Sequence, residues 1–225
     1  MTMYWEENKQ DEYSSAVSDE IVDLAYSITC KSLPVDHAYA LSEAMAKALR
    51  WFVEDEYVGL HTIHVAESGN GWFRPDEKNA LLHPSRRTKL VLRVTRNRID
   101  DANELIGKIL DISGCPLQID GVMVRPLSTI TTIFSRYVVA DRNDDEQQFL
   151  SSVMAELNGL GIKPKKMLCG KEKIISIPAK TLLTRSLMIA DISVDDSVTL
   201  QQKGLGEHRK LGCGLFIPHK GINEV

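Results

Sequence analysis

The segments of this chain that favour strands and helices occur in the same order twice, and this repeat limits the possible folds more than any other feature. Short apolar or alternating runs predict strands, and apolar side chains three and four positions apart predict helices. Each half is predicted to run strand, helix, strand, strand, helix, strand. In the first half the predicted strands are 21–28, 58–65, 89–94 and 117–127, and the predicted helices are 32–52 and 100–110. In the second half the predicted strands are 130–140, 173–177, 182–192 and 215–217, and the predicted helices are 144–160 and 193–202.

Two copies of the βαββαβ order predict an α+β protein with two tandem ferredoxin-like (RRM-like) domains. A chain of 225 residues is long enough to bury a core in each of two such domains. The predicted divisions are an acidic N-terminal tail at 1–18, a first domain at 19–128 and a second domain at 129–225.

The net charge of −4 is unevenly distributed along the chain. The first 20 residues hold six acidic side chains and one lysine, so the negative charge is concentrated there. Basic side chains cluster further along, around 86–89, 163–173 and 208–210. Local patches decide where a polyanion binds, so any nucleic acid is expected to bind at a restricted site.

Residues 204–214 are rich in glycine and also contain Arg209 and Lys210. Glycine permits positive φ angles and lets another molecule approach the backbone closely. Successive N–H groups in such a turn can form a concave anion site. The segment therefore predicts a backbone cradle for nucleic-acid phosphate, and a tightly packed loop without a ligand is the alternative. Its glycines are Gly204, Gly206, Gly212 and Gly214.

The cysteines are widely spaced, and no CxxC pair or neighbouring histidine suggests a zinc site. We therefore expect no metal, no cofactor and no disulfide, with the four cysteines serving as small buried residues. No apolar run approaches the roughly 20 residues that span a bilayer, and the N-terminus is acidic. A cytoplasmic protein without membrane contact is expected.

Three motifs together resemble the CRISPR-associated repeat-processing endoribonucleases of the RAMP superfamily, in their MYXAN subtype. Residues 34–41 (PVDHAYAL) resemble the N-terminal helix motif of that family, and residues 86–93 (RRTKLVLR) its basic strand. Residues 204–216 resemble its terminal glycine-rich motif, although Glu207 and His208 replace an expected glycine and arginine. The motifs occur in family order and span about 20–218, and the family has tandem ferredoxin-like domains.

The resemblance implies metal-independent cutting of CRISPR precursor RNA within the repeat. The ribose 2′-hydroxyl attacks the adjacent phosphate and leaves a 2′,3′-cyclic phosphate and a 5′-hydroxyl, which requires RNA rather than DNA. His37, expected in the first turn of the first helix, is the candidate general base or acid. A helix N-terminus disfavours imidazolium, so a neutral ring is expected there. Tyr39 and His208 are the alternatives that would assist or replace it.

The resemblance also implies which residues contact the RNA, and CRISPR repeat RNA (crRNA) and other Cas subunits of a type I effector complex are the implied partners. Alternate strand positions place Arg87, Lys89 and Arg93 on one side, which favours a binding surface over a solvated face. The full implied set is Arg86, Arg87, Lys89, Arg93, Gly204, Gly206, Arg209, Lys210, Gly212 and Gly214. Two other functions remain open: a non-catalytic CRISPR repeat RNA-binding subunit, and an assembly subunit whose glycine segment contacts protein.

Overall fold

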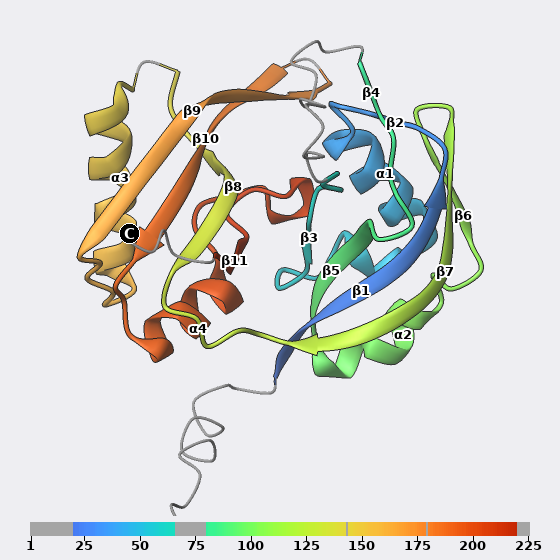
Figure 1. The fold of residues 1–225 in the computed structure, drawn as a ribbon, viewed down its shortest axis with the longest axis horizontal. Helices are drawn as coiled ribbons and strands as arrows, with labels where there is room; N and C mark the ends of the chain where they lie inside the picture. Colours follow the sequence, from blue (N-terminus) through green and yellow to red (C-terminus); the bar gives the residue numbers. More distant parts are fainter. Residues whose placement is uncertain (1–19, 66–79, 143, 179, 220–225) are drawn as a thin grey trace, which may run out of the picture.

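The computed structural model describes residues 20–65, 80–142, 144–178 and 180–219, and the predicted acidic tail lies outside these residues. The chain forms two domains, each with helices packed on one face of an antiparallel sheet (Figure 1). A short pair of strands, β2 (Leu33–Pro34) and β4 (Leu81–Leu82), forms a separate small sheet.

The first domain has a five-stranded sheet in the order β3-β5-β1-β7-β6. Its central strand, β1, pairs antiparallel with β5 and with β7, and β6 adds a hairpin strand at the edge. Without β6, the order is that of a ferredoxin-like sheet. The strands are β1 (Ile21–Cys30), β3 (Gly59–Leu60), β5 (Lys89–Thr95), β6 (Ile109–Ile112) and β7 (Cys115–Pro126).

One face of this sheet is buried under the helices of the first domain. Alternate β1 side chains such as Leu24 and Tyr26 pack with Leu41 and Met45, which lie four positions apart on α1. The Tyr26 hydroxyl donates to the Ala102 carbonyl in α2 at 2.9 Å, which ties the second helix to the same sheet. The helical segments are α1 (Ala38–Ala48), η1 (Arg50–Phe52), η2 (Arg96–Arg98) and α2 (Ile99–Asn103).

The second domain has a four-stranded sheet in the order β11-β8-β10-β9, which is the ferredoxin-like order without additions. Phe149, Val153 and Leu157 of α3 pack on one face of this sheet with Leu200 of α4. A capping box at Asp145 and the Ser193 hydroxyl begin these two helices. The elements are β8 (Ile133–Val139), α3 (Glu146–Gly159), β9 (Lys166–Ile177), β10 (Lys180–Ala190), α4 (Val194–Lys203), η3 (Arg209–Leu211) and β11 (Phe216–Pro218).

The predicted fold class, two tandem ferredoxin-like domains, is confirmed by these strand orders. The predicted boundary near 128 falls between the end of β7 and the start of β8. Four predicted elements were clearly wrong in extent: α1 begins at Ala38, β3 is only Gly59–Leu60, α2 ends at Asn103, and β9 begins at Lys166. The first helix starts late because Leu33 and Pro34 pair with β4 and so remain extended.

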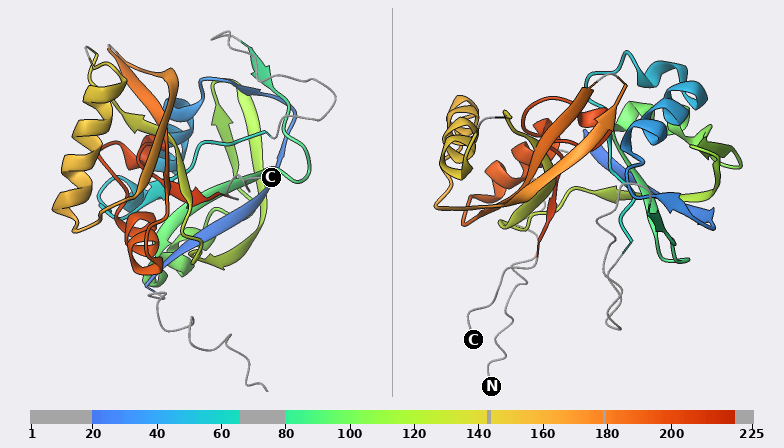
Figure 2. Two further views of the ribbon diagram at one scale, coloured as in Figure 1. Left: turned by 60° about the vertical axis from the view of Figure 1, so that its left-hand side comes forward. Right: turned by 90° about the horizontal axis from the view of Figure 1, so that it is seen from above.

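The domains pack side by side, with the N-terminal end of α1 against the second sheet (Figures 1 and 2). Ala38 belongs to a buried cluster with Tyr137, Ile175 and Leu182 of the second domain. The Asp36 carboxylate also accepts a hydrogen bond from the Ser176 N–H at 3.1 Å. One end of the second sheet is therefore covered by the first domain.

Candidate active site and nucleic-acid interface

The predicted basic strand divides into an exposed turn and a half-buried strand. Arg86 and Arg87 are exposed in the turn before β5. Thr88 is buried, and its hydroxyl accepts a hydrogen bond from the Ser85 N–H at 3.0 Å. Lys89 is half-buried and donates from Nζ to the Ser27 hydroxyl at 2.8 Å. Exposed guanidinium groups at such a turn suit contacts with phosphate, which position a nucleic acid on a protein.

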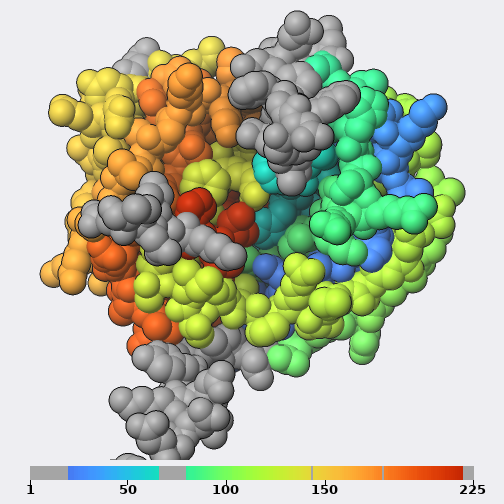
Figure 3. Space-filling view, viewed as in Figure 1, coloured from blue at the N-terminus to red at the C-terminus, as the bar shows by residue number. Residues whose placement is uncertain are grey.

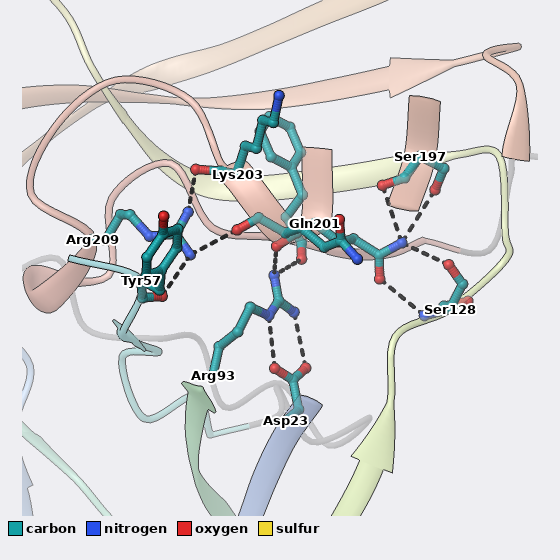
Figure 4. Close-up of polar contacts among 10 residues, drawn as sticks. Asp23, Tyr57, Arg93, Ser128, Ser197, Gln201, Lys203 and Arg209 are labelled. Carbon is teal, nitrogen blue, oxygen red and sulfur yellow. Dashed lines mark hydrogen bonds and ion pairs between the residues drawn. The ribbon is translucent and has the colours of Figure 1, made fainter. Parts of the chain in front are cut away.

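Arg93 occupies a different environment, at the junction of the domains (Figure 4). Its side chain is 1% exposed and forms a two-pronged ion pair with Asp23 at 2.7 and 2.9 Å. Its Nη1 donates to the Gln201 carbonyl at 2.7 Å and to the Phe216 carbonyl at 3.0 Å. These partners accept four hydrogen bonds from the five N–H groups of the guanidinium. The prediction that Arg93 contacts RNA is therefore corrected: this side chain joins the first sheet to the second domain.

Asp23 is kept ionised by this junction. Burial by itself would raise the pKa of its carboxyl, but the charge and hydrogen bonds of Arg93 outweigh burial and lower that pKa. Asp23 is the single charged residue in the strand Ile21–Cys30. That charge was the available signal for a buried ion pair, but the sequence could not identify its partner.

Gln201 extends the junction to the segment that links the domains (Figure 4). Its side-chain amide donates to the Ser128 carbonyl at 2.6 Å and accepts from the Ser128 N–H at 3.0 Å. The same amide nitrogen lies 3.2 Å from the Ser197 hydroxyl and carbonyl, one turn earlier in α4. The linker, α4 and Arg93 are thus held in one hydrogen-bonded network.

The glycine segment adopts the positive φ angles that its composition predicts. The φ angles are 70° at Gly204, 68° at Gly206, 86° at Gly212 and 65° at Gly214. A Cβ at Gly214 would overlap the Leu205 carbonyl, so only glycine fits there. The segment is compact, and three of its four glycines are buried.

The N–H groups of these glycines already have protein acceptors. Gly204 donates to Leu200 at 2.8 Å, Gly212 to Arg209 at 3.1 Å and Gly214 to Tyr137 at 2.7 Å, each time to a carbonyl. Gly206 donates to a Glu156 carboxylate oxygen at 3.0 Å. A bound phosphate would have to replace these protein acceptors at the N–H groups. These N–H groups hold the loop in its packed form, and the binding of phosphate by the four glycines stays a prediction.

Arg209 and Lys210 fasten this loop to the first domain. Arg209 donates to the Gln202 carbonyl at 3.0 Å, to the Tyr57 carbonyl at 3.1 Å and to the Lys203 carbonyl (Figure 4). Burial, reinforced by the charge of Arg93, lowers the pKa of Arg209 to about 10. Lys210 donates from Nζ to the Val53 carbonyl at 2.5 Å. Each cation thus reaches one carbonyl of the first domain, Tyr57 or Val53, and the predicted contact of both with phosphate stays a prediction.

His37 is buried at the N-cap of α1, with 1% of its surface exposed. Its Nδ1 lies 2.8 Å from the Pro34 carbonyl, and its Nε2 lies 2.9 Å from the Ile63 N–H. A carbonyl only accepts and a backbone N–H only donates, so these contacts select the neutral ring with the proton on Nδ1. This geometry agrees with the neutral ring that the sequence predicted. The basic lone pair on Nε2 accepts the hydrogen bond from the Ile63 N–H.

The two alternative catalytic residues, Tyr39 and His208, interact with acidic side chains close to them in the sequence. Tyr39 lies on the outside of α1, where partial desolvation and Glu43 raise the pKa of its hydroxyl. His208 has a left-handed backbone, with φ of 66°, and its Nε2 lies 3.9 Å from a carboxylate oxygen of Glu207. The structure brings neither residue into hydrogen-bond contact with His37.

His61 is a histidine whose environment the sequence did not predict. Burial first, and then the positive charge of Arg93, lower the pKa of His61 to about 3, so its ring is neutral. Its Nε2 is buried and has no hydrogen-bond partner in the described part of the chain. A neutral ring tolerates the surrounding cations, which include Arg136 and Arg209.

A hollow lies between the two domains on the face shown in Figure 3. Parts of β8 and the C-terminal segment border it on one side, and parts of β3 and β5 border it on the other (Figures 1 and 3). Within the described residues, no group of three or more histidine, cysteine or acidic side chains is arranged to hold a metal ion. The described helices include none that is long and apolar enough to cross a membrane.

The strand orders and the shared junction define a protein with two ferredoxin-like domains in tandem. Residues 22–221 match the family model described as Cas6, "Cas6 Crispr". The chain therefore belongs to the Cas6 family, which confirms the resemblance seen in its three motifs.

Individual relatives agree with this assignment. The CRISPR-associated endonuclease Cas6 of Myxococcus xanthus (strain DK1622) is 26% identical over 197 residues, which cover 88% of this chain and 81% of that protein. A solved CRISPR-associated protein Cas6 superimposes with a TM-score of 0.59 at 12% identity, covering 89% of this chain and 100% of that one. A Cas6-related protein from Pyrococcus furiosus has a TM-score of 0.58 at 12% identity, covering 87% and 97%. At these identities the solved structures support the fold alone.

Proposed function

We propose that the protein is an endoribonuclease that cuts CRISPR precursor RNA within the repeat to release guide RNA. The family match over residues 22–221 carries this proposal, because it extends through both domains. The similar protein from Myxococcus xanthus is named an endonuclease, which supports catalysis in this chain as well.

The proposed reaction is a metal-independent transesterification. The 2′-oxygen forms a bond to the adjacent phosphorus while the bond from phosphorus to the 5′-oxygen breaks. A base takes the 2′-hydroxyl proton and an acid supplies one to the leaving 5′-oxygen. The products carry a 2′,3′-cyclic phosphate and a 5′-hydroxyl, and the exposed Arg86 and Arg87 with Lys89 are proposed to hold the RNA backbone.

His37 is the proposed base or acid, and its geometry sets a condition on that role. Its Nδ1 contact with Pro34 keeps the proton on that nitrogen, which leaves Nε2 as the basic atom. To accept the 2′-hydroxyl proton, Nε2 must exchange its bond from the Ile63 N–H for one from the RNA. Bound RNA is therefore proposed to displace the backbone at Ile63 from the ring.

The test is to incubate the protein with its cognate repeat RNA and a chelator, and then to analyse the product ends. Cutting that persists in chelator, with a cyclic phosphate and a 5′-hydroxyl, is expected. A single 2′-deoxy substitution at the cut site should abolish cutting and leave binding intact. Strong inhibition by the chelator, or cutting of the deoxy substrate, would contradict the proposed chemistry.

His37→Ala tests the residue, with His83→Ala as a matched histidine control on an exposed position. The first variant should bind repeat RNA without cutting it, and the second should cut normally. Because His37 is buried, the thermal midpoint of His37→Ala must be measured beside its activity, and His37→Gln provides a variant that retains a polar side chain. Full-rate cutting by both His37 variants would refute the assignment.

A second candidate function is a non-catalytic subunit that binds CRISPR repeat RNA and remains with other Cas subunits in an effector complex. The observation that favours it is the occupation of both His37 ring nitrogens by protein groups. In that case the wild-type protein binds repeat RNA, no product forms under any condition tested, and His37→Ala changes stability alone.

A further inference from the structure

We propose that an apolar row across the open face of the second sheet is a stacking platform for an unpaired base of the RNA. The inference rests on the proposed function because it takes RNA as the ligand. It does not require that the protein cuts the RNA. It adds a binding surface on one face of the second sheet, whereas the sequence motifs pointed to the basic strand and the glycine segment.

The strand register defines the row. Met188 of β10 is paired with Phe134 of β8 on one side and with Leu168 of β9 on the other. Phe134 is in turn paired with Ile217 of β11. Directly paired residues of antiparallel strands project from the same face. The row, which we call the apolar row, therefore crosses all four strands: Leu168, Met188, Phe134 and Ile217.

The apolar row lies on the face opposite the helices. The residues next to its members along each strand, such as Leu187, Ile189 and Phe216, belong to the core beneath α3 and α4. Side chains alternate between faces along a strand, so the row projects from the other face. Leu168 is 59% exposed, and Phe134, Met188 and Ile217 are half-buried.

The same face is covered at its opposite end, where Ile175 and Leu182 pack with Ala38 of α1. The first domain therefore covers one end of the second sheet. The row lies at the other end of the sheet, and one of its strands, β8, borders the hollow in Figure 3. The exposed Leu168 and the half-buried remainder of the row offer apolar surface to a ligand at this end of the sheet.

The chemistry of this face fits an unpaired base. Phe134 stands on a central strand, and the His219 ring lies against it with centroids 5.7 Å apart and planes inclined by 54°. RRM-like sheets stack bases on aromatic side chains of such strands, and every base offers a π face. Arg136 of β8 lies near enough to His61 of the first domain for its charge to contribute to lowering the pKa of that ring. The Nζ of Lys173 lies 5.4 Å from the centroid of the Tyr137 ring. These cations favour a polyanion over an apolar protein partner.

The experiment is a double-mutant cycle, in which a substitution in the protein is combined with removal of a single base from the repeat RNA. Phe134→Leu keeps apolar bulk and removes the aromatic face, and Phe134→Tyr keeps the aromatic face. Ile174→Ala, at a 51% exposed apolar position on β9, is the control. Each purified protein is titrated with repeat RNA and with a set of repeats that each carry one abasic nucleotide, and thermal midpoints are recorded.

Phe134→Leu should weaken the Kd for intact repeat roughly 5- to 150-fold. Phe134→Tyr and Ile174→Ala should bind almost as wild type. Removal of the base at one position should weaken wild-type binding by a similar factor. The same removal should have almost no effect on Phe134→Leu binding, because the contact between that base and the Phe134 ring is already lost in this variant. The slope of log Kd against log salt should not change with Phe134→Leu, whereas Arg136→Ala should lower it by about 0.7.

Wild-type-like binding by Phe134→Leu, or equal abasic effects in the two proteins, would overturn the platform while leaving the proposed cutting intact. Loss of a co-purifying protein with unchanged RNA affinity would also overturn it, because the surface would then be a protein contact. Failure of the wild-type protein to bind any repeat RNA would refute both the platform and the proposed function. Binding that depends on Phe134 without cutting supports the platform and refutes only catalysis.

Discussion

Substitution of Arg93 by alanine should weaken the contact between the two domains and lower the free energy of unfolding. The variant loses a two-pronged ion pair with Asp23 and two hydrogen bonds to carbonyls of the second domain, at Gln201 and Phe216. It also leaves the Asp23 carboxylate, whose side chain is 18% exposed, without its main counter-charge. The perturbation thus combines lost domain contacts with an uncompensated, largely buried charge.

Removing one partner from such a pair typically costs about 3–5 kcal/mol. A chain of this size has a total stability of about 5–15 kcal/mol, so the loss is a large fraction. It corresponds to a fall in Tm of roughly 6–20 °C. Asp23→Ala combined with Arg93→Met should recover much of this loss, since replacing a buried ion pair by apolar groups is often nearly neutral.

The pH dependence has a definite sign. In the folded wild type the pKa of Asp23 lies below its usual value of 3.8, so the ion pair stabilises above that pH and is lost as the pH falls through the folded pKa. In Arg93→Ala, burial without Arg93 raises the pKa of Asp23, so stability is lost as the pH rises above 3.8. The difference in unfolding free energy between the two proteins should therefore grow from about pH 3 to pH 7.

Urea unfolding followed by tryptophan fluorescence measures this difference, and the chain contains three tryptophans. Lys89→Ala is the matched control, because Lys89 lies on the same strand and forms one hydrogen bond, with Ser27. The control should lose no more than about 1 kcal/mol. A loss below about 1 kcal/mol for Arg93→Ala, or a difference that does not change with pH, would refute this account of the junction.

Three further predictions address the loop, the basic turn and a cysteine. Gly214→Ala should lower the free energy of unfolding in urea by about 2–4 kcal/mol. Gly206→Ala should lower it by about 1 kcal/mol, because the added Cβ would meet no atom of the described residues within 4 Å. Equal losses would mean that tight packing does not select glycine at position 214. Arg86→Ala with Arg87→Ala should weaken repeat-RNA binding and lower the salt slope by about 1.4, with unfolding unchanged, and an unchanged slope would exclude both residues as phosphate contacts. Burial raises the pKa of the Cys213 thiol to about 12, so native protein at pH 8 should resist iodoacetamide at this residue until it unfolds, and rapid native alkylation would contradict its burial.

Local patterns predicted the elements of the fold where local forces control them. Helix α3 begins at Asp145 with a complete capping box, and α4 begins at Ser193, as their sequences indicate. The start of α1 was wrong because Pro34 pairs with a strand that lies far along the chain. The need for positive φ in the glycine segment was visible in the sequence, since it depends on the missing Cβ alone.

The candidate site was predictable only in part, because charge in a sequence does not identify the partner of that charge. Arg86 and Arg93 belong to one basic motif, yet Arg86 is exposed and Arg93 is 1% exposed. Arg209 was singled out as a phosphate contact, but nothing in the sequence indicated its contact with the Tyr57 carbonyl, 152 residues away in sequence.

The sequence by itself determined the repeated βαββαβ order, the family motifs and the positions that must be glycine, since periodicity and backbone sterics act over a few residues. Only the tertiary structure decided which cations face solvent and which close the domain junction. It also decided that His37 has both ring nitrogens occupied and that Phe134 shares a row with residues of three other strands. Burial and hydrogen-bond partners depend on segments distant along the chain, so these properties arise only when the two sheets come together.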